Sequence, residues 1–374
     1  MALRLAACVM FVGFAWSTDW KSNAEALKAR GDAQGALNAY LEAAKTAPTS
    51  AELQDEIGFL LAVLKRPAEA KQRFQRVIQL HPNYAPANYH LGVIYASEGD
   101  TARAIPFLEK AVRLAPKTAD YRRQLGLTYH ALGTSLEKSG DLTRARDAYE
   151  KAVEFAPAEA SARNALGFVY VQLRDADRGI AEFQKILATN PDDLVAMTNI
   201  GFAHLQKGDY DKAAEQLRIV LARDPDSAVA HYDLGLALKQ KDDLEAAKKE
   251  FLDAVRLDPN MAEARYTLGI TFWQLGDFEG TSSQMRAAIA LRPDYAAAHY
   301  MLGTALKQKD DLEGALAALR ESIRFNPEDP GPHNTIGQVL KIMGDVEGSK
   351  KAFAEGARIK AAKEAEQAKM LQRR

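Results

Sequence analysis

Few side chains in this sequence are spaced for catalytic or metal chemistry. The one cysteine, Cys8, lies in an apolar stretch near the N-terminus, so the rest of the chain can form neither a disulfide nor a thiolate metal site. Three of the seven histidines, His231, His299 and His333, are separated by multiples of 34 residues. Metal ligands must lie a few residues apart or on touching elements, whereas equivalent positions of stacked helices are about 8 to 10 Å apart. We therefore predict no metal and no cofactor, and interpret these histidines as helix-packing residues.

The motifs that mark most active sites are missing from the sequence. It contains no glycine-rich phosphate loop, no nucleophile elbow and no zinc-binding histidine pair. No segment is predicted to form the sheet on which such motifs are mounted. Its many carboxylates occur in helix-prone segments, where they ordinarily face solvent. We predict that the chain is not an enzyme.

A second set of side chains recurs at the same spacing and is suited to binding. Amide groups offer both a donor and an acceptor to a partner's main chain, and exposed aromatic side chains act as interface anchors. The predicted partner-binding residues are Gln172, Gln206, Gln240, Gln274, Gln308, Tyr89, Tyr232, Tyr266, Tyr300, Phe168, Phe202, Trp273, Lys239 and Lys307. The alternative is that repeat duplication alone produced the period, with polar residues at the ends of helices simply facing solvent.

The elements that position these residues repeat along the chain. Prolines lie 34 residues apart, except for one interval of 41, at Pro48, Pro82, Pro116, Pro157, Pro191, Pro225, Pro259, Pro293 and Pro327. An aliphatic residue followed by glycine recurs in the same register, as in Leu91-Gly92 and Leu234-Gly235. Later in each unit a small residue precedes a large apolar one by four, as in Ala247 and Phe251, which places both on one helix face. Each unit is therefore predicted to be a helix, a turn and a second helix.

The turn between the two helices has its own signature. Gly-Asp recurs there, for example at Gly99-Asp100 and Gly276-Asp277. Glycine supplies a left-handed residue and aspartate caps the helix that follows. In the second unit Lys65-Arg66-Pro67 replaces this pair, so we expect a locally different turn there.

These residues resemble the tetratricopeptide repeat, in which a large residue, Leu-Gly, Tyr, Ala, Phe and Pro recur at fixed positions. The resemblance implies an all-α fold, an α-solenoid forming a right-handed superhelix of about ten helix-turn-helix units. It also implies that the first helices line a concave groove that holds a peptide or helix of a partner protein. The expected units are 17–50, 51–84, 85–118, 119–159, 160–193, 194–227, 228–261, 262–295, 296–329 and 330–363, within an array over 17–363.

Two segments depart from the repeat. The long interval adds seven residues to the unit 119–159, and we place them near residues 133–139. Seven residues are almost two helical turns, so they lengthen the first helix or its turn and protrude at one edge. They are interpreted as a tolerated insertion, with a partner-specific contact as the alternative. The polar segment 364–374 is expected to form a C-terminal capping helix or tail.

The first sixteen residues have the order of a secretory signal peptide. Arg4 precedes an uncharged stretch from Leu5 to Trp16. The stretch is too short to cross a bilayer, which takes about 20 helical residues, so we expect cleavage and no stable membrane span. We assign 1–16 as a signal peptide and predict a periplasmic or secreted protein. Lipidation of Cys8 from an upstream start, and a cytoplasmic protein whose apolar start belongs to the first helix, remain alternatives.

The charge composition argues against nucleic acid and membrane partners, so we expect the partner to be a protein. The 49 basic and 50 acidic side chains give a net charge of -1, so no bulk field favours nucleic acid or anionic lipid. We predict a non-enzymatic scaffold that assembles cell-envelope or other extracytoplasmic complexes. The alternatives are a cytoplasmic scaffold and an accessory subunit related to the repeat regions of O-linked sugar transferases, and the oligomeric state stays open.

Overall fold

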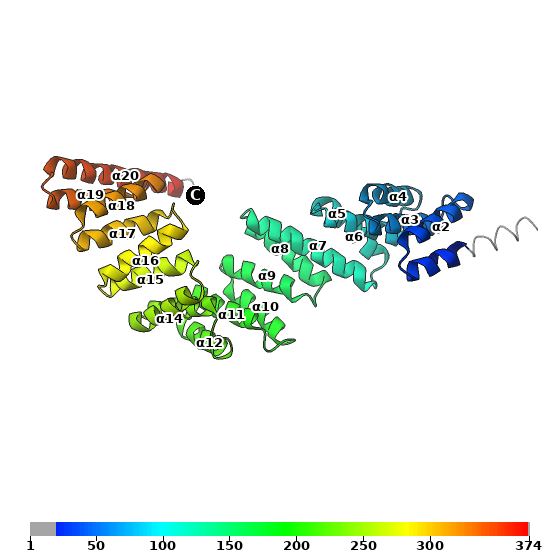
Figure 1. Cartoon of the computed structure of the whole chain (residues 1–374), viewed down its shortest axis with the longest axis horizontal. Helices are drawn as coiled ribbons and strands as arrows, with labels where there is room; N and C mark the ends of the chain where they lie inside the picture. The colour runs from blue at the N-terminus through cyan, green and yellow to red at the C-terminus, as the bar shows by residue number, and fades with distance from the viewer. Residues whose placement is uncertain (1–19, 373–374) are drawn as a thin grey trace, which may run out of the picture. The chain divides into compact units, whose positions relative to one another are not determined.

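The computed structural model describes residues 20–372, which form α-helices joined by short turns (Figure 1). No strand occurs in this part of the chain. The predicted all-α solenoid of helical hairpins is confirmed. No helix between residues 20 and 372 has both the length and the apolar composition that crossing a bilayer requires. The signal peptide expected over 1–16 lies outside the described residues.

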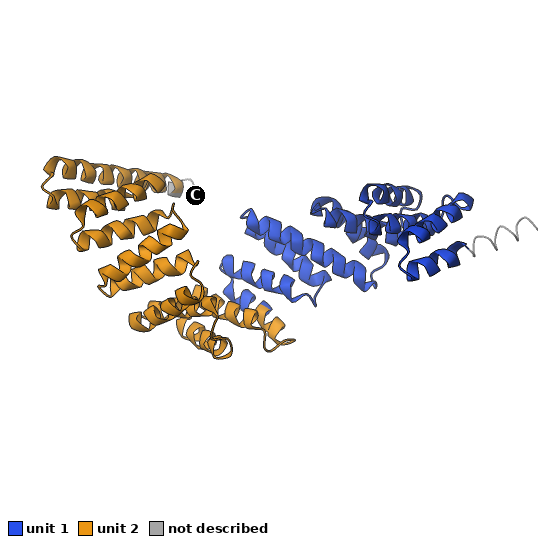
Figure 2. Ribbon diagram, viewed as in Figure 1, with its two compact units in different colours: residues 1–182 blue, residues 183–374 orange. Residues whose placement is uncertain are grey.

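The helices divide into two compact units, residues 1–182 and 183–374 (Figure 2). In the first unit, helical residues 20–29 are followed by α2 (Ala33–Thr46), α3 (Ala51–Val63), α4 (Pro67–Leu80), α5 (Ala85–Ser97), α6 (Thr101–Leu114), α7 (Ala119–Lys138), α8 (Leu142–Phe155) and α9 (Ala160–Gln172). The boundary between the units falls within α10 (Ala176–Leu187). The second unit continues with α11 (Leu194–Lys207), α12 (Tyr210–Arg223), α13 (Ala228–Gln240), α14 (Leu244–Leu257), α15 (Ala262–Gln274), α16 (Phe278–Leu291), α17 (Ala296–Gln308), α18 (Leu312–Phe325), α19 (Pro330–Ile342) and α20 (Val346–Gln372).

Each hairpin closes around the glycine of its first helix. A Cβ atom at Gly58 would lie 2.6 Å from the ring of Phe74, sixteen residues later, and one at Gly303 would lie 2.6 Å from Leu319. The predicted pairing of a small residue with a large one is confirmed, because Ala70 is fully buried beside Phe74 in the core. A single hairpin cannot cover this apolar stripe, so neighbouring hairpins within a unit share one core.

The hairpin α7–α8 corrects the expected position of the seven extra residues. Helix α7 has 20 residues, whereas α5 and α9 have 13 each. In the regular hairpins the glycine of the first helix faces the residue sixteen positions later. In α7 this relationship holds for Gly133, which faces Tyr149, whereas Gly126 faces Ala156 at the end of α8. Residues 133–139 therefore occupy regular positions beside α8, because the packing of Tyr149 selects the later of two Leu-Gly pairs. Toward the preceding hairpin the earlier pair is in regular register, because Tyr129 donates to Glu109 twenty residues before it, as Tyr170 does to Glu150. The extra turns therefore extend beyond α8 at the N-terminal end of α7.

The turns confirm the predicted Gly-Asp chemistry, and the turn between α3 and α4 differs from it as expected. Gly99 has φ +79°, and the Asp100 carboxylate accepts a hydrogen bond from the Arg103 backbone N–H at 2.9 Å. In the α3–α4 turn Arg66 makes no side-chain cap hydrogen bond and Pro67 begins the helix, while Lys65 keeps the left-handed conformation, with φ 59°. The packing of α3 on α4 requires a left-handed residue in this turn. Lys65 therefore adopts a backbone conformation that favours glycine.

The C-terminal segment is not a separate capping helix. Residues 364–372 continue α20, and side chains 361–370 are exposed. The last apolar contacts come from Ile359 and the residues before it. The end of the array is thus covered by the first half of α20, while its polar extension covers nothing.

Candidate functional site

The first helices of the hairpins carry the predicted binding residues. We call the exposed surface of α13, α15 and α17 the first-helix face. The predicted tyrosines are half-buried: Tyr89, Tyr232, Tyr266 and Tyr300. The Tyr232 hydroxyl lies 3.4 Å from Oγ1 of Thr267 on the next first helix, and the Tyr266 ring lies 4.9 Å from that of Tyr295. Burial raises the pKa of both Tyr232 and Tyr266.

In the first unit, Tyr89 of α5 stacks on Tyr121 of α7 with ring centroids 4.4 Å apart. Like Tyr232, it therefore links consecutive hairpins. These tyrosines hold the stack together, and the parts of their rings left exposed provide rigid surface for a ligand. They are therefore both structural contacts and candidate anchors.

The predicted glutamines mark the edge of the first helices. Gln240, Gln274 and Gln308 are the last residues of α13, α15 and α17, and all three are exposed. Gln206 is exposed near the end of α11. Gln172 differs, because it is half-buried and donates to Oε1 of Glu137 at 3.0 Å.

The remaining predicted residues are partly buried. Phe168 and Phe202 are half-buried on α9 and α11. Trp273 lies 5.0 Å from Phe278 of its own hairpin, measured between ring centroids. The Lys307 ammonium donates to Oε1 of Gln338 on α19 at 2.7 Å. Lys239 is half-buried, and this burial lowers its pKa.

The sequence analysis missed Asp233, the most unusual group on α13. Its side chain is only 5% exposed, between Ala230 and Ala237, which are fully buried. No residue in the described chain gives its carboxylate a hydrogen bond or an ion pair. Burial alone raises the pKa of Asp233 to about 7. An acidic residue within a helix stripe of alanines was the signal that could have found it.

A buried carboxylate without a hydrogen-bond or charge partner is energetically unfavourable. Removing an ionised carboxylate from water is costly unless a hydrogen bond or opposite charge compensates it. Strongly shifted carboxyl groups therefore concentrate at functional sites. The Asp233 oxygens are not among the fully sealed unpaired atoms of the described residues, so the group still reaches the surface.

One group has the composition of a metal site. Ligand atoms of His231, Glu250 and Asp253 lie within 4.8 Å of one another. Each already has a protein partner: His231 Nε2 donates to the Pro225 carbonyl at 3.0 Å, its Nδ1 lies 2.6 Å from Glu250, and Asp253 accepts from Arg256 at 2.9 Å. The cluster thus joins α13 to α14 and to the preceding loop, which agrees with the predicted packing role of His231.

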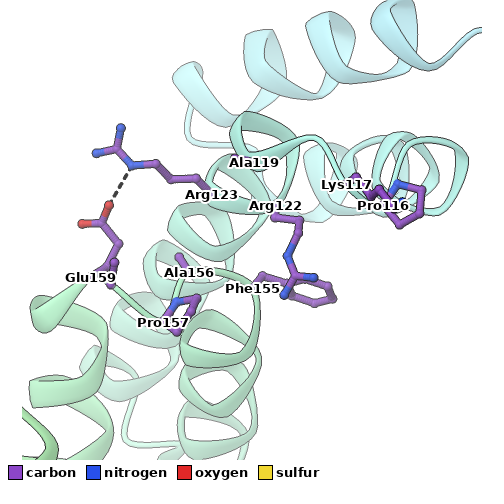
Figure 3. A pocket seen from close by; sticks show the side chains of 10 residues that line it. Pro116, Lys117, Ala119, Arg122, Arg123, Phe155, Ala156, Pro157 and Glu159 are labelled. Atoms are coloured by element: carbon purple, nitrogen blue, oxygen red, sulfur yellow. Dashed lines mark hydrogen bonds and ion pairs between the residues drawn. The ribbon is translucent and has the colours of Figure 1, made fainter.

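A pocket lies at the N-terminal end of the long helix α7. It has a volume of about 620 Å³. Its walls come from the start of α7 and from the end of α8 with the following loop (Figure 3). Basic side chains and an apolar floor line it, and the sequence analysis identified the insertion but not this pocket.

Comparisons with known proteins identify the repeat. Family models described as tetratricopeptide repeat match residues 54–84, 83–158, 130–193, 199–262 and 266–330. One of these models matches more than half of the chain by itself.

Solved structures of similar architecture share little sequence with this chain. Yeast Tom70 is 13% identical, with a TM-score of 0.47, and the match covers 96% of this chain and 97% of that one. MamA from Desulfovibrio magneticus RS-1 is 22% identical, with a TM-score of 0.44, over 46% of this chain and 97% of that one. No curated protein matches the sequence. The family assignment therefore rests on the repeat models.

Proposed function

The chain belongs to the tetratricopeptide repeat family, and from this premise we propose that it is a non-catalytic scaffold that holds a basic segment of a partner protein on the first-helix face. Proteins of this family bind protein partners, and that general role applies here. The observation that carries the finer proposal is the unpaired, buried carboxylate of Asp233.

Asp233 lacks the partner that a buried carboxylate requires. A lysine or arginine of a bound segment supplies both the opposite charge and the hydrogen-bond donors. The group does not serve the hairpin itself, because no described residue bonds to it. Burial of the Asp233 carboxylate destabilises the free protein. Binding of a basic segment therefore offsets this destabilisation.

The surroundings of Asp233 suit an extended amphipathic segment. Tyr232 and Tyr266 present partly exposed rings on consecutive first helices. The exposed parts of these rings favour apolar residues beside the basic residue of the ligand.

The second part of the proposal concerns the compartment. We propose that the scaffold acts outside the cytoplasm, in the assembly of envelope or surface complexes. Arg4, the apolar stretch from Leu5 to Trp16, and the small residues Gly13, Ala15 and Ser17 support this. Intact mass of the protein from fractionated cells tests it: a periplasmic or secreted species beginning near Trp16 or Thr18 is expected. A cytosolic species that retains Met1 would overturn it.

The binding proposal is tested by selecting phage-displayed random dodecapeptides on the purified protein. Wild type is expected to enrich Arg or Lys at one position of the selected peptides. Asp233→Asn keeps the side-chain shape, and it is expected to lose this enrichment and to bind the best peptide about tenfold more weakly. Asp226→Asn, an exposed carboxylate in the preceding loop, is the matched control and should behave as wild type. Equal affinity of wild type and Asp233→Asn would refute the role of Asp233, and failure to select any peptide would refute peptide binding altogether.

A further inference from the structure

The seven extra residues of α7 enlarge the pocket described above. Gly126 faces Ala156, the residue directly after α8, so residues 119–125 extend beyond α8. First helices of 13 residues, such as α5, have no such extension. The overhanging turns and the loop after α8 line the 620 Å³ volume. A smaller space of about 290 Å³ lies at the corresponding place between the start of α11 and the end of α12, where no residues are inserted.

Much of the pocket lining is apolar. Phe155, Ala156 and Pro157 line one wall, and Pro116 and Ala119 line another. Its volume lies within the range of about 300 to 1,000 Å³ that is typical of small-molecule sites. Such sites combine apolar walls with a few polar groups that fix the ligand's orientation.

The polar groups of this pocket are mainly cationic. Lys117, Arg122 and Arg123 line it, with Glu159 as the one acid. Arg123 donates from Nε to Glu159 at 2.7 Å, and Figure 3 shows this pair at one side of the view. Glu159 is therefore already neutralised.

Arg122 and Lys117 remain available to a ligand. Arg122 makes one long hydrogen bond, from Nη2 to the Glu154 carbonyl at 3.3 Å, and has no acidic partner among residues 20–372. Lys117 likewise has no ion pair in that part of the chain. In Figure 3 the Arg122 side chain points from α7 toward the wall that holds Phe155. A guanidinium presents several N–H donors in a plane that matches a carboxylate or a phosphate.

We propose that this pocket binds a small organic anion, a carboxylate or a phosphate ester attached to an apolar body. Arg122 and Lys117 hold the anionic group, and the apolar body lies against Phe155 and Pro157. The site is separate from the first-helix face of the second unit. It gives the scaffold a ligand site in a space that is about 620 Å³ beside the insertion and only about 290 Å³ at the corresponding place between α11 and α12.

Calorimetric titration with phenyl phosphate, benzoate and inorganic phosphate tests the proposal. Phenyl phosphate or benzoate is expected to bind saturably and more tightly than inorganic phosphate, which lacks the apolar body. Preference for phenyl phosphate assigns the site to phosphate esters, and preference for benzoate assigns it to carboxylates. Arg122→Gln is expected to raise the Kd about tenfold, while Arg76→Gln, an exposed arginine of α4, leaves it unchanged. Absence of binding to both aromatic anions, or an unchanged Kd in Arg122→Gln, would overturn the proposal.

A deletion variant tests whether binding depends on the overhang of α7 when the charged lining residues are kept. Removal of residues 133–139 retains all four charged lining residues and places Gly126 sixteen residues before Tyr149, as Gly133 is now. Residues 119–125 then no longer extend beyond α8. This variant is expected to stay folded and to lose the aromatic anions. Wild-type affinity in the folded deletion variant would show that the overhang does not form the site.

Discussion

Gly235 of α13 lies so close to Phe251 of α14 that a Cβ atom at position 235 would be 2.6 Å from the ring. Phe251 is fully buried, so its ring has little space in which to move. Gly235→Ala is expected to lower the free energy of unfolding by about 1 to 3 kcal/mol despite the better helix propensity of alanine. Urea denaturation followed by circular dichroism measures this change.

A double-mutant cycle identifies the cause of that loss. If the clash with the ring is responsible, Gly235→Ala costs much less in a Phe251→Ala background, where the ring is absent. Equal costs in the two backgrounds would contradict the steric explanation.

The second prediction concerns the left-handed residue of the α3–α4 turn. Lys65 has φ 59°, where glycine has φ near +80° in the equivalent turns at Gly99 and Gly276. A left-handed conformation costs an L-residue about 1 to 2 kcal/mol, part of which glycine loses again through its greater freedom when unfolded. Lys65→Gly is expected to raise the free energy of unfolding by about 0.5 to 1 kcal/mol. Lys65→Ala is the control, and an equal gain from alanine would show that backbone strain is not the reason.

The repeat pattern predicted the hairpins because each signature residue has a local packing role. Gly58 faces Phe74 and Ala70 lies buried beside it, and the same spacing recurs through the array. Capping by aspartate after a left-handed glycine was equally predictable. These interactions span few residues, so a single sequence is enough to identify them.

The features that the sequence did not predict depend on contacts between elements. Gly126 and Gly133 both follow a leucine, and only the position of Tyr149 decides which one faces the second helix. Asp233 looked like one of many helix carboxylates, because its residue type and position do not state its burial. The pocket required the overhang of α7 to be known first. The turn at Lys65 shows the same effect, since helix packing outweighs the preference of a lysine.

The third prediction follows from the raised pKa of Asp233. The folded chain holds this proton up to about pH 7, whereas the unfolded chain releases it near pH 3.8, so the stabilising contribution of the protonated form is complete below pH 3.8 and is lost as pH rises through 7. Between pH 5 and pH 8 wild type should lose about 2 to 3 kcal/mol relative to Asp233→Asn, whose amide does not titrate. Urea denaturation of both proteins at the two pH values measures the difference. Asp226→Asn should follow the wild-type curve, and a constant difference between wild type and Asp233→Asn would show that Asp233 has an ordinary pKa.

The last prediction concerns how the array accommodates its long helix. Deletion of residues 120–126 leaves Ala119 seven residues before Gly133, the separation of Ala85 and Gly92 in the regular unit. Because the pairing of Gly133 with Tyr149 is retained, the shortened hairpin is expected to keep the helical signal per residue and a cooperative thermal transition. Deletion of 133–139 restores the same length by transferring the pairing to Gly126, and it should give a similar melting temperature. A loss of cooperative unfolding in both variants would show that the overhanging turns are needed to join the neighbouring hairpins, and that the insertion is part of the core of the first unit.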